Sequence, residues 1–186
     1  MLHRPFKTGV FILEGLNSFA TTFYFYYFYF FMQKQFGFGD KANLMLAALN
    51  GFVCMIAAWW GGRFAQRAGY FTALKLGFGI MGVVLLIGAG LESPSAHIVV
   101  MVVAVAGMSL TWATLEALVS DGERPDRLPQ NIGIYNVVWA GTGALAYFTG
   151  GAMLDALGLR SLFYVPAAFF LAQLAGVFWL ERVNRL

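Results

Sequence analysis

Long apolar runs separated by short polar connections dominate the pattern of this sequence. The two runs on either side of residues 61–74 have no polar face wide enough for an amphipathic helix in water. Runs of this kind recur at about the 20 residues that an α-helix needs to cross the roughly 30 Å hydrocarbon core of a bilayer. They do not alternate between apolar and polar positions, as the strands of a membrane barrel do. The pattern therefore predicts an all-α membrane protein.

We expect six membrane-spanning helices, joined by short connections, in a single domain over residues 1–186. Their approximate ranges are 8–32, 43–61, 70–91, 98–119, 131–157 and 162–180. The first apolar run is too long for a signal peptide and carries Glu14 and Asn17, and no small-residue cleavage site follows it. We therefore interpret this run as the first spanning helix.

Composition supports this assignment and excludes several classes of function. Only 11% of the residues are charged, whereas a soluble domain has roughly a quarter. Cys54 is the single cysteine and lies in an apolar run, so the chain can form no internal disulfide. His3 and His97 are too far apart to predict a metal site, and no cofactor is expected. An intramembrane enzyme is disfavoured because the sequence has no Gly-x-Ser-x-Gly motif and no paired His and Asp set.

Lysine and arginine are distributed unequally between the two sides of the predicted helices. Nine lie at the termini, in the turn between helices two and three, and in the loop between helices four and five: Arg4, Lys7, Arg63, Arg67, Lys75, Arg124, Arg127, Arg182 and Arg185. The other side has three, which are Lys34, Lys41 and Arg160. The positive-inside bias therefore predicts a cell-membrane protein with both termini in the cytoplasm. Since topology explains these charges, the net charge of +3 does not indicate nucleic-acid binding.

An internal repeat appears when the turn between helices two and three is aligned with the turn between helices five and six. At an offset of 89 residues, three glycines match three others: Gly61, Gly62 and Gly69 fall on Gly150, Gly151 and Gly158. The two turns lie on opposite faces of the predicted membrane domain. This arrangement predicts two inverted three-helix repeats, as in many secondary transporters.

The first of these turns resembles the loop motif of major facilitator superfamily (MFS) transporters, which reads roughly G-x-x-x-D-R-x-G-R-R. Gly62, Arg67 and Gly69 stand at the glycine, arginine and glycine positions, and Gln66 replaces the aspartate. A gating role would have Arg67 cap a helix or pair with an acidic group, while the glycines allow close helix packing. The alternative is an ordinary loop on the positive side.

The second turn and the six-helix layout extend the resemblance to the whole chain, as the N-terminal half of such a transporter. The sequence GGAMLDALGLRSLF is similar to the family pattern G-G-x-x-x-D-x-x-G-x-R-x-x-F, with Asp155 and Arg160 in place. Tyr147 and Phe148 stand where antiporters of the family carry Gly-Pro, and the fourth helix has no arginine. The sequence therefore does not establish proton coupling.

The resemblance implies alternating-access transport of a small-molecule substrate between two six-helix halves. The second half would be either a missing C-terminal half of a longer chain or a second copy of this one. A non-transporting multi-pass scaffold or sensor remains the alternative. Aromatic, amide and acidic groups suit sugars, organic cations or amphiphilic drugs, and they do not identify the substrate.

Polar side chains on one face of the first helix predict a cavity. Glu14, Asn17, Thr21 and Tyr24 recur at spacings of three and four residues, and charged side chains inside membranes usually face a cavity or a partner. Helix packing through Asn17 and Thr21 is the alternative. Most of the aromatic run 23–31 is interpreted as an interfacial belt.

The fourth and fifth helices supply the rest of the predicted cavity. The full set of candidates is Glu14, Asn17, Tyr24, Trp112, Glu116, Asn136 and Trp139. Lys75 lies at a similar depth to Glu116, so we expect it to neutralise Glu116 or Glu14, either as a structural ion pair or as part of a titrating site. The third and sixth helices are almost wholly apolar and are expected to face lipid.

Overall fold

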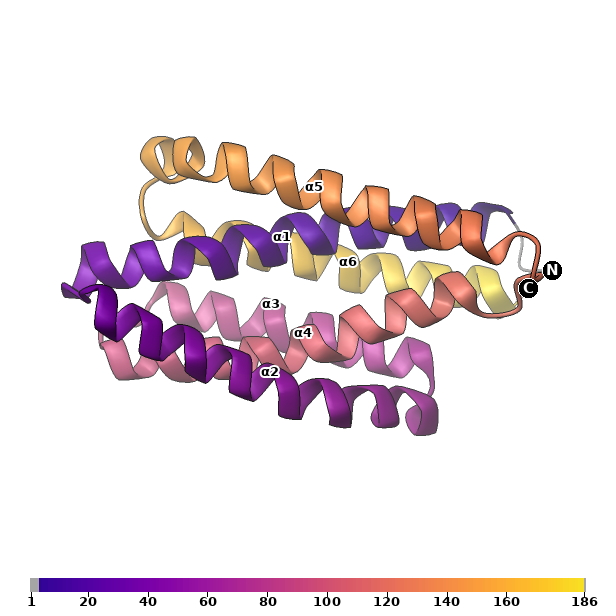
Figure 1. Ribbon diagram of the computed structural model, residues 1–186, viewed down its shortest axis with the longest axis horizontal. Helices are drawn as coiled ribbons and strands as arrows, with labels where there is room; N and C mark the ends of the chain where they lie inside the picture. The colour runs from indigo at the N-terminus through magenta and orange to yellow at the C-terminus, as the bar shows by residue number, and fades with distance from the viewer. Residues whose placement is uncertain (1–3, 186) are drawn as a thin grey trace.

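Residues 4–185 form six α-helices in a computed structural model (Figure 1). Their bounds are α1 (Arg4–Phe36), α2 (Asp40–Ala68), α3 (Tyr70–Ala89), α4 (Pro94–Ser120), α5 (Leu128–Leu157) and α6 (Ser161–Arg185). Each predicted helix is present, and all but α3 extend beyond the predicted apolar run. The start of α1, the end of α6, the α2–α3 turn and the α4–α5 loop lie at one end of the bundle (Figure 1).

Five of the described helices, α2 to α6, are long and apolar enough to cross a membrane. With 33 residues, α1 is also long enough, and it runs along the whole bundle (Figure 1). Its most apolar stretch is less hydrophobic than those of the other five helices, because polar and tyrosine residues interrupt it. The chain is therefore a multi-pass membrane protein in which α1 runs beside five helices with longer apolar stretches.

Two glycines with positive φ make the sharp turns of the two repeats. Gly69 joins α2 directly to α3 with φ 90° and ψ 148°, and Gly158 ends α5 with φ 84° and ψ 160°. This backbone region is open essentially to glycine alone. Both amides donate hydrogen bonds to the carbonyl four residues earlier, on Ala65 at 3.0 Å and on Leu154 at 2.9 Å. The glycines matched at an offset of 89 residues thus terminate their helices in the same way.

Replacing Gly69 by alanine should lower the thermal unfolding midpoint of the purified protein, because alanine is strained at this φ, at a cost of about 1–3 kcal/mol. The matched control is Gly62→Ala. Gly62 lies inside α2, where an added Cβ would meet no atom within 4 Å, and alanine favours a helix over glycine by about 1 kcal/mol. Equal midpoints for the two variants would show that the turn does not need a glycine.

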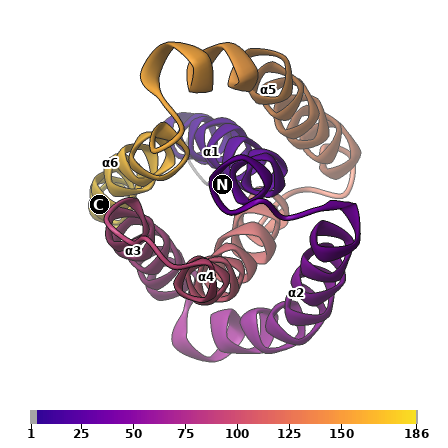
Figure 2. The ribbon, with the colours of Figure 1, turned by 90° about the vertical axis from the view of Figure 1, so that its left-hand side faces the viewer.

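The six helices form two groups that each mix the repeats. α1 packs against α5 and α6, whereas α4 packs against α2 and α3. The two groups meet mainly along α3 and α6, and to a smaller extent along α1 and α4 (Figure 2). Matched glycines make the equivalent close contacts. A Cβ on Gly61 would lie 2.8 Å from the carbonyl oxygen of Ser109 on α4, and one on Gly150 would lie 2.2 Å from the Tyr27 ring on α1. The second helix of each repeat thus packs on the first helix of the other repeat.

α3 is a well-packed helix, contrary to the expectation that α3 and α6 mainly face lipid. About 44% of the apolar window is buried in both α3 and α6, against 11% in α2 and 17% in α5. Small residues explain the difference, because Gly77 of α3 meets α4, and Gly82 and Gly88 meet α6 side chains. Their missing side chains let the helices approach closely. The apolar character of α3 and α6 therefore reflects their packing within the bundle as well as lipid contact.

Two ion pairs link distant segments of the chain at the end of the bundle where α1 begins, one to the α4–α5 loop and one to α6. The Lys7 ammonium lies 2.5 Å from Oε1 of Glu123 and donates a hydrogen bond of 2.8 Å to the Val119 carbonyl in the last turn of α4. The hydrogen bond from Lys7 and its positive charge hold the pKa of Glu123 below its ordinary value. Lys75 pairs with Glu181 on α6. The predicted pairing of Lys75 with Glu116 or Glu14 is therefore wrong, because the end of α6 lies beside the start of α3.

Candidate functional site

A cavity of about 230 Å³ lies between α1, α2, α4 and α5. Its lining residues are Glu14, Asn17, Ser18, Thr21, Thr22, Phe25, Tyr26, Asn50, Met108, Trp112 and Trp139. A second cavity of about 380 Å³ runs along α1 and α5 and shares Ser18, Thr22, Tyr26 and Trp139 with the first. Most of the polar lining therefore comes from one face of α1.

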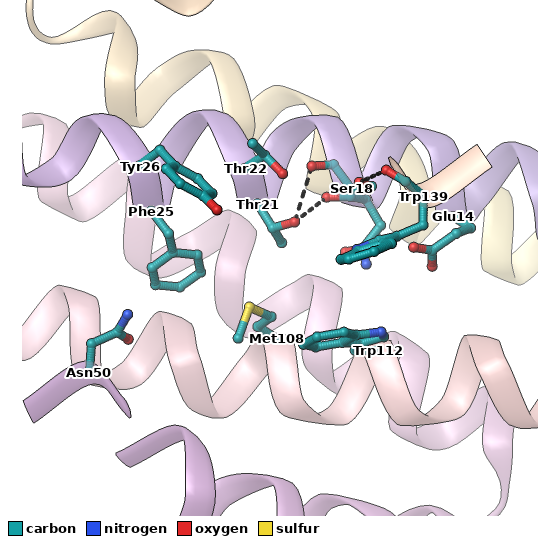
Figure 3. A pocket seen from close by; sticks show the side chains of 11 residues that line it. Glu14, Ser18, Thr21, Thr22, Phe25, Tyr26, Asn50, Met108, Trp112 and Trp139 are labelled. Atoms are coloured by element: carbon teal, nitrogen blue, oxygen red, sulfur yellow. Dashed lines mark hydrogen bonds between the residues drawn. The ribbon is translucent and has the colours of Figure 1, made fainter. Parts of the chain in front are cut away.

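Two of the hydroxyl groups on this face of α1 donate hydrogen bonds to backbone carbonyls. Thr21 Oγ1 donates to the Asn17 carbonyl at 2.7 Å, and Ser18 Oγ donates across to the Trp139 carbonyl of α5 at 2.7 Å (Figure 3). Thr111 on α4 donates a long bond of 3.5 Å to the Asn17 side-chain oxygen. These groups help to hold α1 against α4 and α5, and their donors are already used.

Glu14 differs from these residues because its carboxylate has no hydrogen bond. The side chain is 0% exposed, and neither oxygen finds a donor among the residues that the structure describes. The Tyr135 hydroxyl and the Asn17 amide lie near the carboxylate and could donate to it after a small adjustment, and Glu116 is near enough to repel it. None of the salt bridges formed by the described residues includes Glu14. A buried carboxylate of this kind is costly and has unused capacity to bind a ligand.

Two tryptophans from neighbouring helices of the second repeat form a wall of the cavity. The indole rings of Trp112 on α4 and Trp139 on α5 are stacked, with centroids 6.1 Å apart and planes 19° apart. In Figure 3 the Glu14 carboxylate points into the space beside these rings. Both tryptophans remain about two-fifths exposed, at 41% and 43%. The cavity thus places one carboxylate next to a broad, accessible aromatic surface.

Four of the seven predicted cavity residues line this cavity: Glu14, Asn17, Trp112 and Trp139. Tyr24 does not, because it is 1% exposed and packs against the rings of Phe25, Phe28 and Phe163. At 100° per residue, Tyr24 lies about 80° around α1 from Glu14, whereas Phe25 lies within about 20°. The face predicted from spacings of three and four residues therefore turns around the helix axis, and at Tyr24 it no longer points toward the cavity.

Asn136 and Glu116 also lie outside the cavity lining and are exposed to the surroundings of the bundle. The neighbouring Tyr135 is instead the buried residue of this turn of α5, at 4% exposure, close to Glu14. Sequence reasoning missed Ser18 and Thr22, although two hydroxyl residues four apart in an apolar helix were a usable signal. It also missed Phe25 and Met108, for which an apolar sequence offers no such signal.

The loop motif around Arg67 makes different contacts from those expected. Arg67 is exposed and has no ion pair or hydrogen bond within the part of the chain that the structure describes. Gly62 approaches no neighbouring helix, and the close contact is made by Gly61 instead. Arg63 stacks over the Trp59 ring at 3.7 Å from its centroid. A gating role for Gly62, Arg67 and Gly69 therefore stays a prediction, and Gly69 acts as the turn residue.

Comparison with protein families gives a match over nearly the whole chain. A family model described as Major Facilitator Superfamily matches residues 10–185. No individual curated protein matches the chain significantly.

Proposed function

The chain belongs to the Major Facilitator Superfamily, and on that premise we propose that it forms one six-helix half of a secondary transporter that carries a small solute by alternating access. The observation that supports this most is the cavity between α1, α2, α4 and α5, with a buried carboxylate that has no hydrogen bond. A scaffold would gain nothing from such a group, whereas a substrate site uses it.

The exposed apolar faces of α2 and α5 support the proposal that a second six-helix half completes the site. Phe52 and Trp59 on α2 and Val137 and Phe148 on α5 are all more than half exposed, at 57% to 84%. These two helices flank the cavity, which has lining residues on both. A second half packed against them would enclose a substrate from the opposite side. That half is either a further segment of a longer protein or a second copy of this chain.

Transport should therefore require two halves. The chain is reconstituted into vesicles as monomers verified by cross-linking, as dimers, and joined to any six-helix segment encoded after Leu186. Uptake is measured with labelled sugars, organic cations and amphiphilic drugs. We expect no uptake by monomers and uptake of at least one solute by a two-half assembly. Uptake by monomers would overturn the half-unit proposal, and the absence of uptake by every assembly would overturn transport of these solutes.

We further propose that both termini face the cytoplasm, as the lysine and arginine distribution predicts. Glu92 and Arg124 lie in connections at opposite ends of the bundle. In a Cys54→Ser background, a membrane-impermeant maleimide should label Glu92→Cys on intact cells, and should label Arg124→Cys only after permeabilisation. The reverse pattern would place the termini outside.

A further inference from the structure

We propose that the cavity selects lipophilic organic cations, with the positive group held near Glu14 and apolar groups held against Trp112 and Trp139. This inference rests on the proposed transport function and deepens it by naming the substrate class of the same site.

The charge of the cavity lining is the first argument. Glu14 is the one charged residue among the described residues that line the two connected cavities, and neither lining includes a lysine, arginine or histidine. Because the carboxylate is removed from water and has no protein cation to pair with, a monovalent cation in the cavity would compensate its burial. An anionic ligand would find no positive group in either lining to pair with, and it would be repelled by Glu116 nearby.

The aromatic surface is the second argument. The stacked indoles of Trp112 and Trp139 lie beside Glu14, and Phe25 and Tyr26 continue the lining along α1 (Figure 3). Aromatic faces attract cations, and tryptophan attracts them most strongly. They also bury the apolar parts of a ligand. A carboxylate and several rings in one cavity therefore fit a cation that carries aromatic or aliphatic groups.

A pair of probes of the same shape and opposite charge tests this inference: tetraphenylphosphonium, a cation, and tetraphenylborate, an anion. Binding of each to the purified protein in detergent is measured by equilibrium dialysis. We expect the wild-type protein to bind the cation about tenfold or more tightly than the anion, and Glu14→Gln to lose that preference. The matched control is Glu92→Gln, which removes an exposed carboxylate outside both cavities. This variant should keep the preference for the cation.

Equal binding of the two probes by the wild-type protein would overturn the inference without depending on whether any variant folds. Retention of the cation preference by Glu14→Gln would overturn the role of Glu14. These results are independent of flux. If an assembly takes up a neutral solute but the protein binds the two probes equally, the cation inference fails and the transport proposal stands. If the protein prefers the cationic probe but no assembly takes up any solute, the transport proposal fails and the cation inference stands.

Discussion

Replacing Gly77 by leucine is expected to prevent stable packing of α3 on α4 and to lower the yield of folded, monodisperse protein severely. A Cβ on Gly77 would lie 2.6 Å from Thr111 Cγ2 and 2.8 Å from the carbonyl oxygen of Gly107. Gly107 faces back in the same way, since its own Cβ would lie 3.0 Å from the Gly77 carbonyl oxygen. Because backbone atoms form both sides of the contact, no side-chain rotation can relieve it.

Gly77→Leu should be destabilising because its gain in helix propensity is smaller than its cost of overpacking. Leucine favours a helix over glycine by less than about 1 kcal/mol, whereas overpacking of a close contact costs about 1–3 kcal/mol and sometimes more. Leucine adds three further carbons beyond the clashing Cβ, so we expect a net loss of about 3 kcal/mol. The loss is measured by the thermal midpoint and by fluorescence-detected gel filtration in detergent.

Gly79→Leu is the matched control, two residues away on the same helix. A Cβ there would meet only Leu174, at 4.0 Å, so this variant should fold with a midpoint near that of the wild type. If Gly77→Leu also folds normally, the close crossing of α3 and α4 does not hold the bundle together.

Loss of uptake is the second large effect, expected on replacing Glu14 by glutamine or Asn17 by leucine. Both residues line the cavity, and each variant removes a polar contact without adding charge to the membrane. In the two-half assembly that transports, we expect uptake to fall about tenfold or more, because a buried charge or hydrogen bond to substrate is worth roughly 1.5–3 kcal/mol. Membrane insertion and thermal midpoint should stay close to those of the wild type.

Tyr24→Phe is the control that separates the structure from the sequence pattern. Tyr24 belongs to the predicted polar face, but the structure buries it among other rings, and its hydroxyl has no hydrogen bond to any described residue. The variant should therefore keep full uptake. If Glu14 and Asn17 tolerate these changes with uptake intact, the cavity is not the substrate site. A scaffold or sensor predicts that leucine is tolerated at both positions.

The helices and their ends were largely predictable because the information is local. Runs of about 20 apolar residues specify a spanning helix by themselves, and Gly69 and Gly158 mark the turns because glycine alone adopts their backbone geometry. The repeat was visible for the same reason. Four of the six matched glycines meet a steric requirement of their own: Gly69 and Gly158 at turns, and Gly61 and Gly150 at close helix contacts.

The cavity was only partly predictable, since it depends on rotation about the helix axis. Glu14 and Asn17 were identified because polar side chains inside a membrane helix are costly and usually face a cavity or a partner. Tyr24 was misplaced because a rotation of about 80° over ten residues moves a side chain from the cavity into the core. Met108 carries no polar signal at all, and it joins the lining only because α4 presents that face to α1.

The sequence by itself determined that this protein is a six-helix membrane domain of two inverted repeats, because hydrophobicity, helix length and glycine conformation act over short stretches of chain. Only the tertiary structure decided which helices pack together. It packed α5 and α6 against α1, and it packed α2 and α3 against α4. It also paired Lys75 with Glu181 across 106 residues, and it left Glu14 without a hydrogen bond beside two tryptophans. These relations depend on the close fit of side chains from distant segments, and no local pattern encodes them.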